Sequence, residues 1–141
     1  MEKIKKLKVY TVIIDGIDKS GKDTIAKYVW YLDKRLNVFV RGRPSLVVYA
    51  KKFNRQCEYE LPYKDVLYVH CYVDENDWSI RCNITNESKI NYDNDTQMFF
   101  DAFDILDNNN YYTMTFNTTQ LTPYIIAKQI IDKINKLNEE L

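Results

Sequence analysis

Two glycines and a lysine near the N-terminus have the spacing of a loop that binds phosphate groups. Gly16, Gly21 and Lys22 fit the Walker A pattern of glycine, four residues, glycine and lysine. In such a loop the backbone N–H groups turn toward phosphate oxygens, and the lysine reaches the outer phosphates. A buried strand is predicted over 9–14 and a helix over 23–36, so the positive end of a helix faces the anion. The pattern therefore predicts a nucleotide site rather than a chance glycine turn.

The residue that follows the loop lysine departs from this pattern. Asp23 stands where Ser or Thr is expected, and a hydroxyl comes one residue later at Thr24. In the usual loop this hydroxyl contacts the Mg²⁺ ion that accompanies the nucleotide. A carboxylate could hold the metal or repel the phosphates, so the sequence leaves open which of the two residues meets it.

Strand-like and helix-like segments alternate along the rest of the chain. Apolar runs predict further strands at 38–40, 66–73 and 112–116. Capping and proline signals predict helices that begin near Pro44, Asp74, Asn94 and Thr122. Such alternation builds a three-layer α/β/α fold of the P-loop nucleoside triphosphate hydrolase type around a mainly parallel sheet of about four strands. Ligands of such sheets bind at the carboxyl ends of the strands.

A polar, asparagine-rich stretch interrupts the alternation at 82–92. It has no long apolar run that would anchor it to a core, so a mobile, lid-like segment is predicted there.

The single histidine of the chain, His70, lies inside the apolar run at 66–73. A lone histidine in such a strand is more often a packed residue with a backbone partner than a catalyst.

Length and charge limit the classes of protein that fit. The chain has 141 residues and equal numbers of basic and acidic residues, 20 each, so its formal net charge is zero. One domain over 1–141 is expected at this length. A neutral chain argues against general binding to nucleic acid or to a membrane surface. The sequence has neither an apolar run of about 20 residues nor the features of a signal peptide, so a cytoplasmic protein is expected.

The stretch from Ile14 to Thr24 resembles the P-loop of thymidylate kinases and related deoxynucleoside monophosphate kinases. Further pieces follow in the same order. The segment 41–45 with Tyr49 resembles the family's Asp-Arg, Ser and Tyr motif, the helix that leads to Arg81 resembles the approach to the lid, and 117–119 resembles the adenine-side loop. The resemblance implies ATP as donor, Mg²⁺ as cofactor and a deoxynucleoside monophosphate as acceptor.

The resemblance also implies a role for each matching residue. The donor phosphates would be held by Gly16, Lys19, Ser20, Gly21 and Lys22. The metal would lie beside Thr24, Asp23 or Asp15, and Asp15 could orient metal-bound water. Adenine would lie against Asn117 and Thr118. The acceptor would contact Asp18, Arg41, Ser45 and Tyr49. Transfer itself would depend on Lys22, Arg41, Arg81 and Asp15, with Arg41 as a bidentate clamp on phosphate.

The chain departs from this family in two places. Val40 stands where the family has the aspartate of its Asp-Arg pair. Leu36 leads almost directly into Asn37, which leaves no room for the family's intervening strand and acceptor-covering helices. Phosphoryl transfer depends on positioning and electrostatic stabilisation, so a shortened acceptor site threatens activity more than nucleotide binding.

Three functions fit these observations. The first is Mg-dependent transfer of the γ-phosphoryl group of ATP to a deoxynucleoside monophosphate. The second is a nucleotide-binding module without kinase activity that acts through a partner. The third is a kinase acting on nucleic acid, whose backbone would follow Arg41, Arg43, Lys51, Lys52 and Arg55. The base of the acceptor and the formation of a homodimer stay open.

Overall fold

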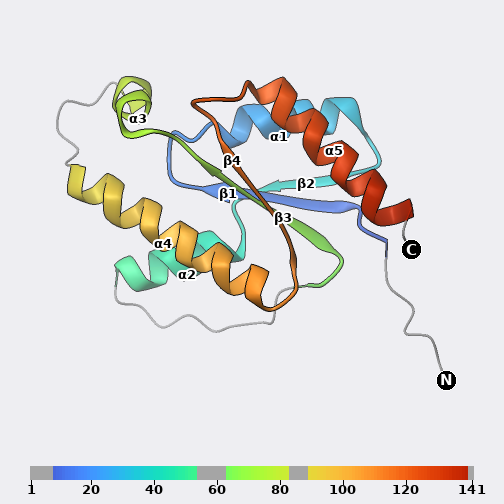
Figure 1. Cartoon of the computed structure of the whole chain (residues 1–141), viewed down its shortest axis with the longest axis horizontal. Coiled ribbons are helices and arrows are strands. Elements are labelled where there is room, and N and C mark those ends of the chain that lie inside the picture. Colours follow the sequence, from blue (N-terminus) through green and yellow to red (C-terminus); the bar gives the residue numbers. More distant parts are fainter. Residues whose placement is uncertain (1–7, 54–62, 83–88, 140–141) are drawn as a thin grey trace.

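The computed structural model describes residues 8–53, 63–82 and 89–139 and places a sheet between two layers of helix (Figure 1). Its strands are β1 (Thr11–Gly16), β2 (Asn37–Val40), β3 (Val66–Tyr72) and β4 (Tyr112–Asn117). Its helices are α1 (Lys22–Leu32), α2 (Arg43–Lys52), α3 (Glu75–Cys82), α4 (Lys89–Asn108) and α5 (Pro123–Glu139). The strands are all parallel, in the order β2-β1-β3-β4. The predicted α/β fold with a parallel sheet of about four strands is therefore confirmed.

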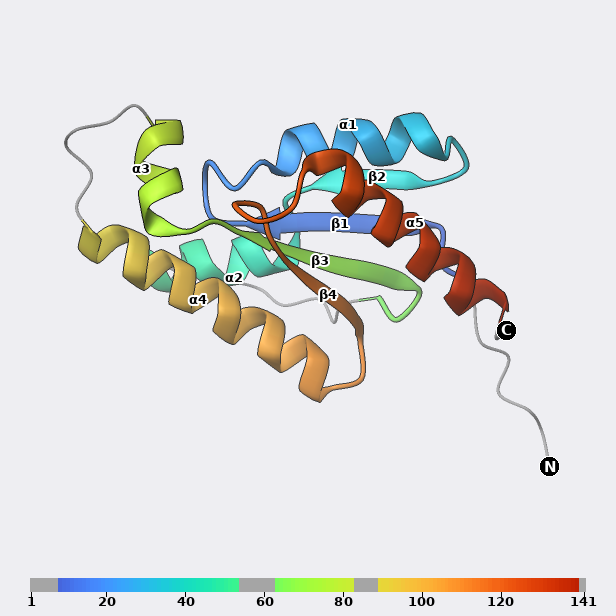
Figure 2. The same cartoon turned by 45° about the horizontal axis from the view of Figure 1, so that its top comes forward.

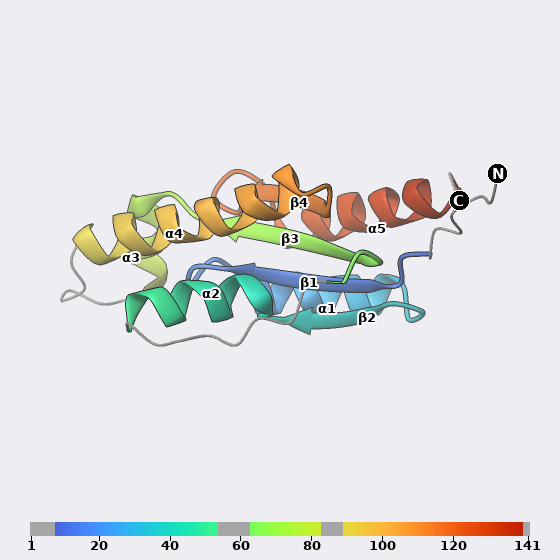
Figure 3. The ribbon, with the colours of Figure 1, turned by 90° about the horizontal axis from the view of Figure 1, so that it is seen from below.

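The register of the sheet brings the loops of interest to one edge. β1 pairs with β3 from Thr11 opposite Val66 to Gly16 opposite Cys71, and with β2 on its other side. Parallel strands end at the same edge of a sheet, so the segments that follow β1, β2, β3 and β4 meet there. In Figure 3, α3 and the first turns of α4 lie at this end of the molecule.

Each face of the sheet has its own core. Figure 2 and Figure 3 show α1 and α5 on one face and α2 and α4 on the other. Because side chains alternate across a strand, Leu67 and Val69 pack toward α1 and α5, whereas Tyr68 packs with Phe99 and Phe103 of α4. The almost wholly apolar sequence of β3 follows from burial on both faces.

The last helix forms where its sequence predicts it. Pro123 suits a first helical turn, and Thr122 Oγ1 accepts a hydrogen bond from Ile125 N at 3.4 Å. The buried stripe of α5 consists of Ile126, Ala127, Ile130, Ile134 and Leu137. Across the described ranges, neither this helix nor any other combines the length and the apolar character that a membrane crossing demands.

The first helix is shorter than its predicted range of 23–36, because it ends at Leu32. Asp33 is extended, and its carboxylate accepts hydrogen bonds from the backbone N and the guanidinium of Arg35. Such local bonds offer the backbone an alternative to the helix. The resulting turn keeps Leu36 in the core, 3% exposed, although it is no longer helical.

The helix that was predicted to begin near Asn94 begins five positions earlier, at Lys89. Tertiary packing holds the additional turn. The Tyr92 ring lies 5.2 Å from the Trp78 ring, and its hydroxyl donates to the carbonyl of Val73. The ends of the predicted lid-like segment, 82 and 89–92, are thus helical. Residues 83–88 lie outside the described residues, so the mobility of this segment stays a prediction.

His70 is fully buried between β3 and α4. Its ring stacks on Phe103 with centroids 4.6 Å apart and meets the edge of Phe100 at 4.7 Å. The packed role is confirmed, but the expected backbone partner is wrong, since neither ring nitrogen has a hydrogen-bond partner among the described residues. Burial, with a smaller contribution from the charge of Lys22, lowers the pKa of His70 to about 4. The imidazole is therefore neutral at pH 7.

Candidate functional site

The loop between β1 and α1 borders a cleft of about 440 Å³ at the carboxyl edge of the sheet. The cleft is lined by Asp18, Lys19, Ser20, Gly21, Lys22, Asp23, Thr24, Arg41 and Arg81. The predicted phosphate-binding loop and both predicted arginines therefore share one space. The three segments that supply them follow β1, β2 and β3, as expected for a parallel sheet.

Gly16 allows the loop to start close against the neighbouring strand. Its φ is +149°, and a Cβ atom at this position would lie 2.0 Å from the carbonyl oxygen of Cys71. Only glycine combines this backbone conformation with this approach. The first glycine of the motif is thus required by the packing of β1 on β3, whatever the loop binds.

Lys22 reaches into the loop from the first position of α1. It is buried, and its Nζ donates to Gly16 O at 2.7 Å and to Ile17 O at 3.0 Å. Burial lowers the pKa of Lys22, and the nearby carboxylates of Asp15 and Asp18 oppose this shift. Two of the three ammonium donors are used by loop carbonyls. The lysine is positioned to meet an anion in the cleft.

Ser20 supplies a second hydrogen-bond donor beside the cleft. Its side chain is buried, yet Oγ has no hydrogen-bond partner within the part of the chain that the structure describes. Its backbone N donates to Ile17 O at 3.2 Å, which shapes the loop. Buried polar groups nearly always have a partner. A hydroxyl without one beside the cleft fits a site whose ligand carries acceptor oxygens.

Asp23 and Thr24 are both exposed on the first turn of α1, where they line the cleft. Carboxylate and hydroxyl oxygens are suitable ligands for Mg²⁺, which takes one or two protein ligands and completes its shell with phosphates and waters. Among the described residues, no three His, Cys, Asp or Glu side chains gather as a metal centre. The donor set fits a metal shared with a phosphate ligand, and the choice between the two residues stays open.

Asp15 is fully buried, and its carboxylate faces the segment after β2. It accepts hydrogen bonds from Gly16 N at 2.9 Å, Gly42 N at 3.0 Å and Ser45 N at 2.8 Å, and also from the Ser45 hydroxyl. Each carboxylate oxygen thus has two donors. The role of Asp15 beside a metal stays a prediction.

Arg41 extends over the cleft from the end of β2. Its Nη2 donates to Asp18 Oδ1 at 3.3 Å, and the two side chains are 61% and 63% exposed. An exposed pair of this kind is weak, so the guanidinium can exchange its partner for an anionic ligand. The residue that replaces the family's aspartate, Val40, packs against the core on the α1 face.

Ser45 and Tyr49, both on α2, make their contacts with other residues than those that line the cleft. The Ser45 hydroxyl is taken by Asp15, and the Tyr49 ring contacts Phe99 with centroids 6.4 Å apart. Burial raises the pKa of Tyr49. The described wall of the cleft contains neither residue. Their predicted contacts with an acceptor stay predictions.

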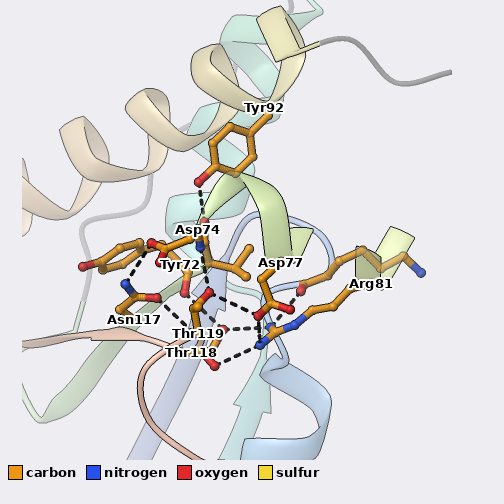
Figure 4. Close-up of polar contacts among 10 residues, drawn as sticks. Tyr72, Asp74, Asp77, Arg81, Tyr92, Asn117, Thr118 and Thr119 are labelled. Atoms are coloured by element: carbon orange, nitrogen blue, oxygen red, sulfur yellow. Dashed lines mark hydrogen bonds and ion pairs between the residues drawn. The ribbon is translucent and has the colours of Figure 1, made fainter. Parts of the chain in front are cut away.

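Arg81 links three segments at the other side of the cleft (Figure 4). Its Nη1 donates to Lys19 O at 3.1 Å and to Thr118 Oγ1 at 2.9 Å. Its Nη2 donates to Thr118 O at 2.9 Å and pairs with Asp77 at 2.8 Å. The predicted lid arginine therefore joins α3, the phosphate loop and the segment after β4.

The predicted adenine-side residues, Asn117 and Thr118, are held in the same network. Asn117 Nδ2 donates to Asp74 Oδ1 at 3.0 Å, and its Oδ1 accepts from Thr119 N at 3.0 Å. The hydroxyl of Thr118 donates to Tyr72 O at 3.1 Å. The described lining of the cleft includes neither of the two predicted residues. Their contact with a base stays a prediction.

Sequence reasoning missed three residues that support the site. Asp77 pairs with Arg81, Thr119 Oγ1 donates to Asp77 at 3.1 Å, and Trp78 Nε1 donates to Asp18 O at 3.2 Å. The spacing of four between Asp77 and Arg81 on a predicted helix could have revealed the ion pair. Trp78 and Thr119 make contacts across 60 and 42 positions, which no local pattern reveals.

Comparisons with known proteins add a likeness of fold. No protein-family model matches the chain, and no curated protein matches its sequence. The structure resembles the crystal structure of the YorR protein of Bacillus subtilis in complex with phosphorylated GDP, with a TM-score of 0.67. The match covers 89% of this chain and 95% of YorR at 19% sequence identity. At this identity the likeness shows the shared fold.

Proposed function

We propose that this chain is a nucleotide-dependent phosphotransferase that moves the γ-phosphoryl group of ATP to a deoxynucleoside monophosphate. The observation that carries the proposal is the cleft itself, which is lined by Lys22, Arg41 and Arg81 and by Ser20, whose hydroxyl has no partner among the described residues. Cations that converge on a loop at a helix N-terminus suit a chain of phosphates. YorR, which has the same fold, was crystallised with phosphorylated GDP.

The donor nucleotide would be held by the phosphate loop. Lys22 Nζ now donates to two loop carbonyls, at 2.7 and 3.0 Å, and phosphate oxygens would offer it charged acceptors in the same place. The Ser20 hydroxyl, which has no partner within the described ranges, would gain one. Asp23, Thr24 or Asp15 would hold Mg²⁺, which when bound neutralises charge on the outer phosphates.

The acceptor phosphate would be held by Arg41. Its present partner, Asp18, is an exposed carboxylate at 3.3 Å, and an acceptor phosphate would replace that carboxylate as a bidentate partner. Asp18 would then be free to accept a hydrogen bond from the acceptor sugar. Arg81, which lies against Lys19 O and Thr118, would stabilise charge on the group in transfer.

A transfer assay tests this proposal. The protein is incubated with Mg²⁺ and ATP labelled on the γ-phosphate, and each deoxynucleoside monophosphate and a short DNA are offered separately. Phosphate transfer to a monophosphate, lost in Lys22→Ala, supports the proposal. If phosphate is transferred only to DNA, the proposed function is wrong and the protein is a nucleic-acid kinase. If the protein binds ATP but transfers phosphate to no acceptor, the proposed function is wrong and the protein is a nucleotide-binding module that acts through a partner.

A further inference from the structure

The start of α2 has no capping side chain of its own. Its N-cap residue is Gly42, so no side chain at that position can accept a hydrogen bond from the first turn. The common capping residues are also excluded there by packing. A Cβ atom at residue 42 would lie 2.6 Å from Ile13 Cγ2. Any cap for this helix must come from elsewhere in the chain.

Asp15 provides that cap from the end of β1. Its Oδ2 accepts hydrogen bonds from Gly42 N at 3.0 Å and from Ser45 N at 2.8 Å. Its Oδ1 accepts from Gly16 N at 2.9 Å and from the Ser45 hydroxyl. A carboxylate at this end also complements the positive pole of the helix. One buried side chain thus joins the phosphate loop to the first turn of α2.

Arg41 directly precedes Gly42, the N-cap residue of α2, and has an uncommon backbone conformation. Its φ is 71°, in the left-handed region that L-residues other than glycine seldom occupy. Such a residue persists where its surroundings determine it. Arg41 N donates to Ile14 O at 2.9 Å, and the next residue, Gly42, is bonded to Asp15. These contacts direct the Arg41 side chain to the cleft.

We propose that Asp15 is a positioning residue for the acceptor: by capping α2, with Ser45 as its partner, it holds Arg41 over the cleft. The inference rests on the proposed function, in which Arg41 binds the acceptor phosphate. It differs from the metal-side role that the family resemblance implies for Asp15. Each oxygen of the Asp15 carboxylate already accepts hydrogen bonds from two donors. These bonds support a capping role rather than a metal-side role.

The first experiment needs no activity. Amide hydrogen exchange is measured by NMR in the parent, Asp15→Asn, Ser45→Ala and the matched control Ser79→Ala, which changes an exposed serine on α3. Exchange at Gly42 is expected to be at least tenfold faster in Asp15→Asn than in the parent or the control. It is expected to rise less in Ser45→Ala, which removes only the hydroxyl bonded to Asp15 Oδ1 and keeps the bond from Gly42 N to Oδ2. Ser45→Ala keeps the carboxylate, so a rise above the control reports on the cap even if Asp15→Asn fails to fold. Exchange at Gly42 no faster than in the control, in every cap variant that folds, overturns the proposal.

The second experiment asks whether the cap acts through Arg41. In a double-mutant cycle, Ser45→Ala is expected to lower kcat/KM for the acceptor about fivefold in the parent and less than twofold in an Arg41→Ala background. The KM for ATP and the Mg²⁺ concentration for half-maximal rate are expected to stay within twofold. Equal losses in both backgrounds overturn the proposal. A shift in the Mg²⁺ concentration for half-maximal rate also overturns the proposal, because it favours a metal-side role for Asp15.

The two proposals fail in different ways. If the parent transfers phosphate but Gly42 exchange is unchanged in the cap variants, the proposed function stands and the positioning role of Asp15 fails. If Gly42 exchange rises but no acceptor is phosphorylated, Asp15 caps α2 without serving transfer, and the acceptor role fails with the proposed function.

Discussion

The two loops that border the cleft are held in place by different kinds of interaction. Within the proposed donor loop, residues 16–24, Lys22 Nζ and Ser20 N donate to carbonyls at most six positions away. Trp78 and Arg81 of α3 add bonds to the carbonyls of Asp18 and Lys19. The proposed acceptor segment after β2 is held by Asp15, which lies 27 positions from Gly42 and 30 from Ser45.

This difference has a consequence for function. The local bonds of the donor loop persist as long as the flanking strand and helix persist. A segment whose bonds come from another strand depends on the exact packing of β1 against α2, since a small displacement breaks both backbone contacts of Asp15 together. We therefore expect substitutions outside the two segments to disturb acceptor binding more than donor binding.

The largest expected effect comes from Gly16→Ala, because the loop at 16–24 starts at the end of β1 and the neighbouring Asp15 anchors the segment after β2. The added Cβ would lie 2.0 Å from Cys71 O at a φ of +149°. We expect the free energy of unfolding, measured with urea, to fall by about 3 kcal/mol or more. The control Thr115→Ala, at an exposed position of β4, is expected to cost less than about 1 kcal/mol. Equal costs for the two variants would contradict the close approach of β1 to β3.

Acid is expected to weaken the face of the sheet that carries α2 and α4. The pKa of His70 is lowered to about 4 by burial, against an ordinary value of 6.5. The unfolded chain takes up this proton below about pH 6.5 and the folded chain only near pH 4, so stability is lost as the pH falls between them, by about 3 kcal/mol in all.

Urea unfolding of the parent and of His70→Phe at pH 7 and pH 4 measures this loss. The chain has one histidine, so the variant removes all histidine titration while the carboxylates are unchanged. The variant is expected to lose less stability than the parent over this range. If both lose the same amount, His70 does not stay neutral in the folded protein.

Lys22→Ala tests the donor side of the comparison. It removes the charge that the loop holds inside the cleft, at 2.7 Å from Gly16 O. We expect affinity for ATP to fall at least tenfold, about 1.4 kcal/mol, in titration calorimetry. Lys27→Ala removes an exposed lysine from the same helix and is expected to leave the affinity unchanged. The same affinity in Lys22→Ala and the parent would place the donor site elsewhere.

Arg41→Ala tests the acceptor side. We expect kcat/KM for the acceptor to fall about tenfold, while ATP affinity stays within twofold, because the donor loop keeps its own contacts. Arg35→Ala is the matched control, since Arg35 is exposed and paired with Asp33 at 2.8 Å, outside the cleft. A parallel loss of ATP affinity in Arg41→Ala would show that the two loops are not independent.

Much of the fold could be predicted because its signals are local. The glycine spacing before Lys22, Pro44 in the first turn of α2 and the apolar run of β3 each report on their own neighbourhood. At the start of α4 the local signals failed because a contact with another element decided. α4 begins at Lys89 rather than Asn94 because Tyr92 packs on Trp78 and bonds to Val73.

The sequence by itself determined the local form of the proposed donor loop, since residues 16–24 contain the glycines, the lysine and the helix start that shape it. Only the tertiary structure decided what Asp15 does. In the sequence it is an acidic residue before a glycine, and in the structure it caps a helix that begins 28 positions later, at Arg43. The physical reason is that a capping carboxylate needs only to be near the N–H groups in space. That proximity comes from the pairing of β1 with β2, which no local pattern of residues encodes.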